Sequence, residues 1–129
     1  MKTIVTTYWQ IDIPDDWVDE HEGDVVSLYA KQGVGTVQIS AAVQERPLRT
    51  SDLRNIAAEH IEAGAKTEDI TLGDFQGFTL SYSSDNDYWR EWYLLAEELM
   101  LFITYDCDLG DEGQEEDIVE AILETLLCK

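Results

Sequence analysis

Short segments in which apolar and polar residues alternate run through most of this chain, and they constrain its fold most strongly. In "GTVQISAAVQ", the apolar residues Val37, Ile39, Ala41 and Val43 fall on one side of an extended backbone. A period of two is the pattern of a β-strand with one buried face. Similar segments are "DVVSLYA", "FQGFTLSYSS", "DYWREWYLLAE" and "LMLFITYDC". The segment "TIVTTYWQIDI" predicts one or two opening strands, with Val5, Trp9, Ile11 and Ile13 on one face. The alternation predicts a sheet.

Two segments have helical spacing instead. One side of a helix that we expect around residues 50–64 carries a stripe of Leu53, Ile56, Ala57, His60 and Ile61. A second apolar stripe predicts a helix around residues 113–127. The last three strands are joined by "SDND" and by Glu97 and Glu98, connections short enough for antiparallel hairpins. The order of strands and helices predicts an α+β fold, with an antiparallel β-sheet flanked by two helices.

Length and charge narrow the range of functions. The 129 residues suit one domain spanning residues 1–129. The net charge of −20 comes from 28 acidic and 8 basic side chains, which disfavours nucleic acid and membrane surfaces and favours a basic partner. No segment resembles a signal peptide or a membrane span, so we expect a cytoplasmic protein. Cys107 and Cys128 are expected to be reduced thiols.

The acidic stretch "DCDLGDEGQEED" invites a calcium-loop interpretation, which its spacing does not support. Counted from Asp106, the fifth position is Gly110 and the sixth is Asp111, the reverse of the order that an EF-hand needs. Carboxylates favour the first turn of a helix, so we interpret this stretch as the start of the last helix. A weak calcium site here or near Asp85 and Asp87 remains an alternative.

Motifs for catalysis and for cofactors are missing from the sequence. There is no GxSxG elbow, no phosphate-binding loop, and no Cys or His at zinc spacing near His21 or His60. We therefore predict a protein without catalytic activity, cofactor or metal. The alternative is a small hydrolytic or ligand-binding enzyme that uses Glu91 and nearby tyrosines, because Glu91 lies among aromatic residues in "DYWREWYLL".

This aromatic segment is the predicted binding surface. Trp89, Glu91 and Tyr93 fall on one face of the strand, and Arg90 and Trp92 fall on the other. If one face is only partly covered, bulky rings form a groove in which a protein segment can dock. The alternative is that all of these rings belong to the core. The residues that we predict to contact a protein partner are Trp89, Glu91, Trp92, Tyr93, Asp85 and Asp87.

The order of elements resembles a known family. The segments "IPDDW", "GDFQGF" and "YWREWYLLAEE", followed by the terminal helix "QEEDIVEAILETL", are similar to the PsbP-like α/β/α sandwich superfamily and its small bacterial DcrB-like domains. These include the Eag chaperones that accompany type VI secretion effectors. The resemblance implies a non-enzymatic domain that binds an apolar helix of a client, usually as a dimer. We therefore expect an adaptor, a chaperone or an immunity-type protein, with a homodimer as an open alternative.

Overall fold

The chain adopts a β-rich fold in a computed structural model that describes residues 1–46 and 48–129. Strands hold more than half of the described residues. The strands are β1 (Lys2–Val5), β2 (Trp9–Ile13), β3 (Trp17–Glu22), β4 (Val25–Ala30), β5 (Gly35–Val43), β6 (Thr67–Leu72), β7 (Phe75–Ser84), β8 (Asp87–Ala96), β9 (Leu99–Asp108) and β10 (Leu127–Cys128). The helical segments are α1 (Thr50–Ile56), α2 (Ala58–Glu62), the 3-10 turn η1 (Leu109–Asp111) and α3 (Glu116–Leu123).

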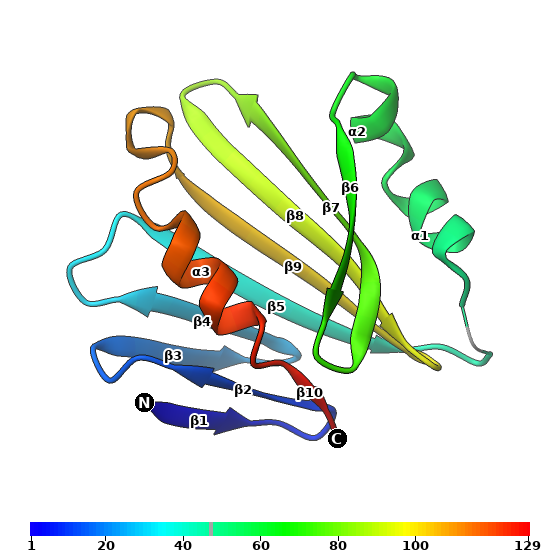
Figure 1. Ribbon diagram of the computed structural model, residues 1–129, viewed down its shortest axis with the longest axis horizontal. Coiled ribbons are helices and arrows are strands. Elements are labelled where there is room, and N and C mark those ends of the chain that lie inside the picture. The colour runs from blue at the N-terminus through cyan, green and yellow to red at the C-terminus, as the bar shows by residue number, and fades with distance from the viewer. Residues whose placement is uncertain (47) are drawn as a thin grey trace.

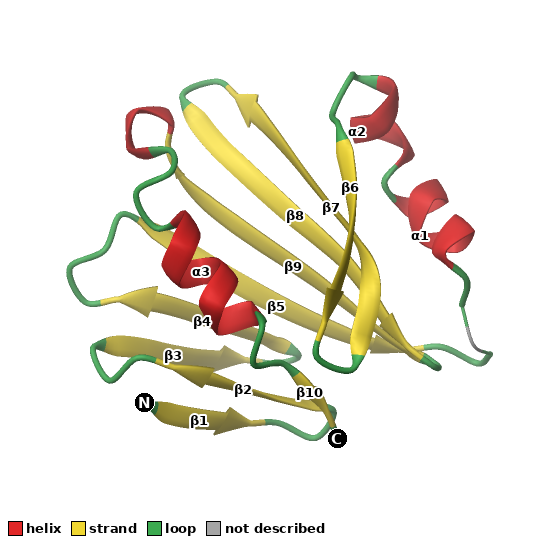
Figure 2. Ribbon diagram, in the orientation of Figure 1, coloured by secondary structure: helices red, strands yellow, loops and turns green. Residues whose placement is uncertain are grey.

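These strands form two sheets. The larger sheet has seven strands in the order β3-β4-β5-β9-β8-β7-β6, and the smaller has three in the order β1-β2-β10. Every strand pair within the described residues is antiparallel, as the sequence predicted. Figure 1 places α3 in front of the large sheet and α1 and α2 beside β6 and β7, and Figure 2 shows how little of the chain is helical.

Tight hairpins join neighbouring strands of the large sheet. The connections β3–β4, β6–β7, β7–β8 and β8–β9 each have two residues, and the first of the two has a positive φ: 60° at Gly23, 58° at Gly73, 57° at Asp85 and 55° at Glu97. A positive φ at this position matches the twist of the flanking strands. The short hairpins predicted at "SDND" and at Glu97 and Glu98 are therefore confirmed.

One face of the large sheet packs against the small sheet and α3. All seven strands of the large sheet contribute buried residues to this layer. The small sheet and α3 cover these residues from the other side. The buried side chains of this first cluster include Ile4, Trp9, Ile11, Ile13, Trp17, Leu28, Val37, Ile39, Trp92, Leu94, Ile103, Val119, Ile122 and Leu123. Burial of these side chains, at roughly 1.5–3 kcal/mol each, is the main stabilising term of the fold.

The opposite face carries a smaller cluster under α1 and α2. Its buried members are Leu53, Ala57, Phe78, Leu80, Tyr93, Leu95 and Met100. They come from α1, the residue between α1 and α2, and strands β7, β8 and β9, and none comes from β3, β4 or β5. The helices therefore cover one half of this face.

The predicted fold class is wrong. We expected an antiparallel sheet flanked by two helices, the α/β/α sandwich that the family resemblance implied, and the structure is mostly β with two sheets and three short α-helices among the described residues. The physical reason is that a second sheet, formed by both ends of the chain, covers much of the face that we assigned to a helix.

The helices are also shorter than expected. The helix predicted around residues 50–64 divides at Ala57 into α1 and α2, and the helix predicted around 113–127 is limited to Glu116–Leu123. The Asp52 carboxylate accepts a hydrogen bond of 2.9 Å from the Arg49 backbone N–H and so fixes the start of α1. Ile56, which we placed on the buried stripe, is 56% exposed because the stripe turns away from the sheet at this break.

Three strands are missing from the prediction. No strand was predicted for "WVDEHE", which forms β3, for "TEDITL", which forms β6, or for Leu127–Cys128, which forms β10. β3 and β6 are the two edges of the large sheet, where outward-facing polar residues weaken the alternation. In β1, Ile4 and not Val5 faces the core.

Only the end of the acidic stretch forms the start of a helix as predicted, because Asp106 and Asp108 belong to β9 and Asp111 belongs to η1. Glu115 precedes α3, and Glu116 and Asp117 occupy its first turn, where unpaired backbone N–H groups favour negative charge. Within residues 1–46 and 48–129, no three His, Cys, Asp or Glu side chains are grouped so that they could hold a metal ion.

The contact between β7 and β8 at Gly77 gives a direct test of this packing. A Cβ added to Gly77 would lie 1.8 Å from the backbone oxygen of Tyr93, so Gly77→Ala must push the two strands apart. We expect the free energy of unfolding to fall by about 1–3 kcal/mol in urea denaturation. Gly110→Ala is the control, because its Cβ meets nothing within 4 Å, and should change stability by less than about 0.5 kcal/mol. Equal unfolding midpoints for the two variants would contradict the observed packing.

Candidate functional site

Strand β8 divides its side chains between the two faces of the large sheet, as the sequence predicted. Tyr93 and Leu95 belong to the cluster under α1 and α2, whereas Trp92 and Leu94 belong to the cluster under α3 and the small sheet. Glu91 lies between Arg90 and Trp92 in the strand and therefore shares the face of Tyr93. Both faces of β8 are buried from Glu91 to Leu95, which makes the Glu91 carboxylate unusual.

The Glu91 carboxylate is held by three side chains from three elements. Tyr82 on β7 donates a hydrogen bond of 2.8 Å to Oε2, and Tyr93 donates one of 2.6 Å to Oε1. His60 on α2 lies with Nε2 3.4 Å from Oε1. The Glu91 side chain is 6% exposed, so these partners replace water around a buried carboxylate.

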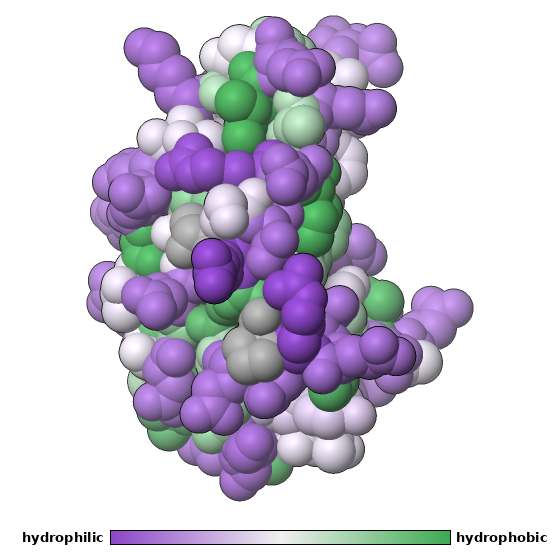
Figure 3. Space-filling model, turned by 90° about the vertical axis from the view of Figure 1, so that its right-hand side faces the viewer, coloured by the Kyte–Doolittle hydropathy of each residue, from purple (hydrophilic) through white to green (hydrophobic). Residues whose placement is uncertain are grey.

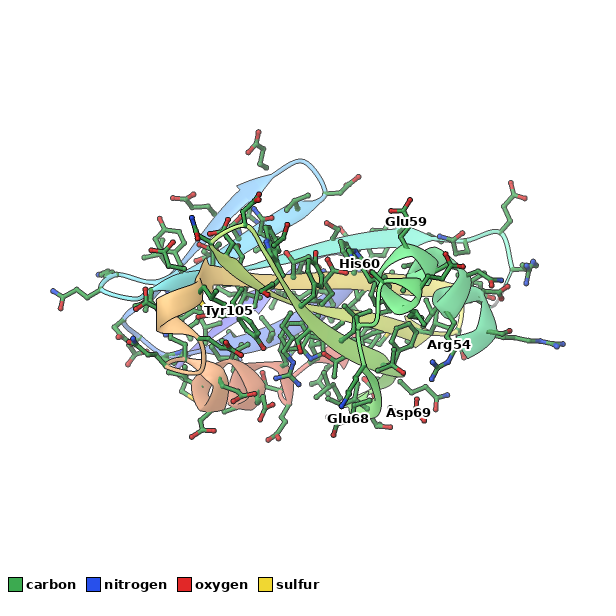
Figure 4. The ribbon with its side chains drawn as sticks, turned by 90° about the horizontal axis from the view of Figure 1, so that it is seen from above. Arg54, Glu59, His60, Glu68, Asp69 and Tyr105 are labelled. Atoms are coloured by element: carbon green, nitrogen blue, oxygen red, sulfur yellow. The ribbon has the colours of Figure 1, made fainter. Side chains whose placement is uncertain are left out.

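The position of each partner has a local cause. The β7–β8 hairpin pairs Leu80 with Glu91 and Tyr82 with Trp89, which brings the Tyr82 ring diagonally beside Glu91. The His60 ring stacks on the Tyr82 ring with centroids 4.4 Å apart and an interplanar angle of 17°. Figure 4 shows His60 on the side of α2 that faces the strands, whereas Glu59 points away. The register of the β7–β8 hairpin could have predicted that Tyr82 lies beside Glu91, but no sequence signal linked His60 to Glu91.

A second contact fastens α1 to the sheet edge. The Arg54 guanidinium lies 5.0 Å above the Phe78 ring and donates hydrogen bonds of 3.2 Å to Thr67 Oγ1 and to Asp69 Oδ1, both on β6. Figure 4 shows Arg54 and Asp69 on this side of the molecule. Because α1 and α2 are short, these polar contacts and the Glu91 cluster fix where the helices sit on the sheet.

Burial keeps the tyrosine hydroxyls of this cluster protonated. The pKa values of Tyr82 and Tyr93 are raised far above their usual value of 10.0, first by burial and then by the hydrogen bond to Glu91 and its negative charge. Both carboxylate oxygens of Glu91 are therefore occupied by donors of the chain itself. In this geometry Glu91 anchors β7, β8 and α2 to one another, and a substrate would have to displace a tyrosine to reach it.

Beyond Glu91 the same face of the sheet lacks a helix. The register places Glu20, Ser27, Gln38 and Thr104 in one row across β3, β4, β5 and β9, ending at Glu91. The neighbouring row contains Tyr29, Thr36, Asp106 and Trp89. We call this surface the open face and define it by Tyr29, Gln38, Trp89, Phe102 and Asp106, all of which are at least partly exposed.

Acidic side chains lie on and beside the open face. Figure 4 shows the β3–β4 hairpin rising above the other strands on the side that carries α1 and α2. Burial and the nearby charge of Asp87 raise the pKa of Asp106, and Tyr29 donates a hydrogen bond of 2.5 Å to Glu20. Figure 3 views the helix-covered end of the molecule, where hydrophilic side chains predominate and apolar ones form separate patches.

The six residues predicted to contact a protein do not form one surface. Glu91 and Tyr93 are 5% and 3% exposed, and Trp92 is 1% exposed on the opposite face. These rings belong to the core, the alternative that the sequence also allowed. Asp85 is exposed in the β7–β8 hairpin, while Asp87 and Trp89 are partly exposed at the end of β8. The predicted contact surface is therefore reduced to these three residues at one end of the open face.

Among the described residues no helix has the length and apolar character that crossing a membrane requires. Comparison with known proteins gives no matching family and no matching curated protein. Solved structures do match.

Two crystal structures share the fold. One, from Bacteroides thetaiotaomicron VPI-5482, has 13% sequence identity and a TM-score of 0.72 and covers 99% of this chain. The other is LpqN of Mycobacterium tuberculosis, described as involved in cell envelope biogenesis, with 15% identity and a TM-score of 0.68 over 94% of this chain. The chain spans 48% of the first structure and 83% of LpqN. At these identities the likeness shows the fold alone.

Removal of the Glu91 charge tests the anchoring cluster. Glu91→Gln keeps the shape of the side chain but replaces one acceptor oxygen with a donor, so a tyrosine hydroxyl loses its charged partner. We expect the free energy of unfolding to fall by about 1–3 kcal/mol in urea denaturation. Glu68→Gln on the exposed side of β6 is the matched control and should stay within about 0.5 kcal/mol of wild type. Identical unfolding curves for wild type and Glu91→Gln would contradict the anchoring role.

The raised tyrosine pKa values predict a loss of stability at alkaline pH. Unfolded tyrosines ionise near pH 10, whereas folded Tyr82 and Tyr93 keep their protons to higher pH. The contribution of the two tyrosines to the free energy of unfolding is therefore complete below pH 10. It is lost as the pH rises from 10 towards the folded-state pKa values. We expect the melting temperature, measured by calorimetry from about pH 8 to pH 11, to fall less steeply in the Tyr82→Phe/Tyr93→Phe variant. Equal slopes of melting temperature against pH in wild type and the double variant would show that the fold does not raise the pKa values of the two hydroxyls.

Proposed function

We propose that this chain is a protein-binding domain without catalytic activity, of an adaptor, chaperone or immunity type, and that its open face receives a basic segment of a partner. The half-covered face of the large sheet is the observation that carries this proposal. A sheet face that is left open beside a buried cluster offers partly exposed rings and polar side chains in extended rows, which suits a peptide segment better than a small substrate.

Charge supports a basic partner. The chain has a net charge of −20, and Glu20, Glu22, Asp106 and Asp87 lie on or beside the open face. Such a field attracts a basic partner and raises the rate of encounter. Trp89 and Phe102 supply rings on which aliphatic stems or guanidinium groups can pack.

The polar rows favour a basic segment over the apolar helix that an Eag-type client presents. The row Glu20, Ser27, Gln38 and Thr104 has no apolar member. The proposal includes a relationship to the DcrB-like domains, which rests on the order of strands and helices along the chain. The enzyme alternative would need Glu91 to exchange its tyrosine partners for a substrate, and the described geometry gives no support for that step.

Paired substitutions in a pull-down with cells of the native organism test the open face. Gln38→Arg adds one positive charge on the open face, and Gln114→Arg adds the same charge at an exposed position before α3. We expect Gln38→Arg to reduce capture of the main partner by about tenfold, which corresponds to about 1.4 kcal/mol, because it combines steric conflict with repulsion of a basic segment. Gln114→Arg should capture the partner as wild type does.

A second pair of variants tests the aromatic ring of the open face separately from its charge. Trp89→Ser removes a partly exposed ring from the open face, and Tyr8→Ser removes an exposed ring beside the small sheet. Loss of the partner with Trp89→Ser alone is the expected result. If both variants, or neither, lose the partner while remaining folded by circular dichroism, the partner binds elsewhere.

A further inference from the structure

A cavity of about 270 Å³ lies on the face of the large sheet opposite Glu91, between β8, β9 and the segment that leads into α3. Three aromatic side chains line it, Tyr88, Trp92 and Tyr105, together with the carboxylates of Glu112 and Glu116. Aromatic rings with adjacent carboxylates attract cations, because the face of each ring is the negative end of its quadrupole. The cavity thus combines two features that recognise positive charge.

One of the protein's own cations, Arg90, also lines this cavity. The Arg90 guanidinium lies 4.7 Å from the centroid of the Trp92 ring, and its Nη1 is 2.7 Å from Glu120 Oε1 and 3.6 Å from Glu116 Oε1. Its Nε donates a hydrogen bond of 3.1 Å to Thr79 Oγ1. Arg90 is therefore neutralised by two carboxylates and does not turn the cavity into an anion site.

The surroundings of the cavity remain negative after this pairing. Glu112 is exposed and lines the cavity, and Glu115 accepts a hydrogen bond of 2.8 Å from the Tyr105 hydroxyl. Burial raises the pKa of Tyr88. The Ser81 hydrogen bond and the Arg90 charge lower this pKa in part, and the charges of Glu112 and Glu116 raise it. The pKa of Tyr105 is likewise raised, by burial and by Glu115. Negatively charged ligands are disfavoured here, and cations are favoured.

We propose that this cavity binds a small organic cation, a quaternary ammonium or guanidinium group that contacts the Tyr88 and Tyr105 rings and is neutralised by Glu112. A volume of about 270 Å³ is near the lower end of the range for ligand pockets and suits a head group with few attached carbons. The proposal is independent of the open face, which lies on the other side of the sheet.

Titration with choline chloride and with N-acetyl-arginine amide, followed by amide NMR at constant ionic strength, tests the proposal. We expect saturable shifts at Tyr88, Tyr105 and residues 112–119, while sodium acetate at the same concentrations produces none. Tyr88→Leu should weaken binding by about tenfold, because it removes one ring, and Tyr88→Phe should stay within about twofold because it keeps that ring. Absence of a saturable shift with either cation overturns the proposal.

A matched pair of charge variants distinguishes a site from general attraction. Glu112→Gln should weaken cation binding by about threefold. Glu124→Gln removes the same charge at an exposed position outside the cavity and should leave the affinity unchanged. Equal weakening by the two variants overturns the proposal, because it would mean attraction by net charge alone.

The two probes also distinguish the source of the cation. Tighter binding of choline supports a free metabolite, whereas tighter binding of N-acetyl-arginine amide supports an arginine side chain of another protein. Both results support the cavity as a cation site.

Discussion

Burial of strand β8 on both faces is the constraint on which the rest of the structure depends. A strand buried on both sides normally contains apolar residues alone, and this one contains Glu91. A carboxylate removed from water must find hydrogen-bond donors, and Tyr82 and Tyr93 supply them, while His60 Nε2 lies 3.4 Å from Oε1. Because His60 belongs to α2, its contact with Glu91 holds α1 and α2 over β7 and β8. The part of the sheet face beyond Glu91 is therefore left without a helix over it.

Local patterns predicted the middle of the molecule well. The alternation in "GTVQISAAVQ" and in the three strands after the helices, the two-residue connections, and the division of β8 into two faces all follow from neighbours in sequence. The antiparallel direction of the β7–β8 and β8–β9 pairs could be anticipated in the same way. For these elements the hairpin register alone determines which side chains meet.

Contacts between distant segments could not be predicted. The small sheet joins β10, at the end of the chain, to β2 near its start, and two residues of β10 carry no recognisable pattern. The break at Ala57 turns α2 so that His60 reaches Glu91 and Ile56 faces solvent. The ion pairs of Arg90 with Glu116 and Glu120 likewise join β8 to α3 across many residues. In each case tertiary packing overrides local preference.

The difference in solvent exposure between Trp89 and the other three tryptophans gives the most direct test of the central claim. Trp9, Trp17 and Trp92 are 1–2% exposed, whereas Trp89 lies partly exposed on the open face. In protein labelled with 5-fluorotryptophan, a soluble paramagnetic agent should broaden the ¹⁹F resonance of Trp89 and leave the other three sharp, with each resonance assigned by Trp→Phe substitution. Broadening of Trp92, or protection of Trp89 in the free protein, would contradict a sheet that is covered on one face and half open on the other.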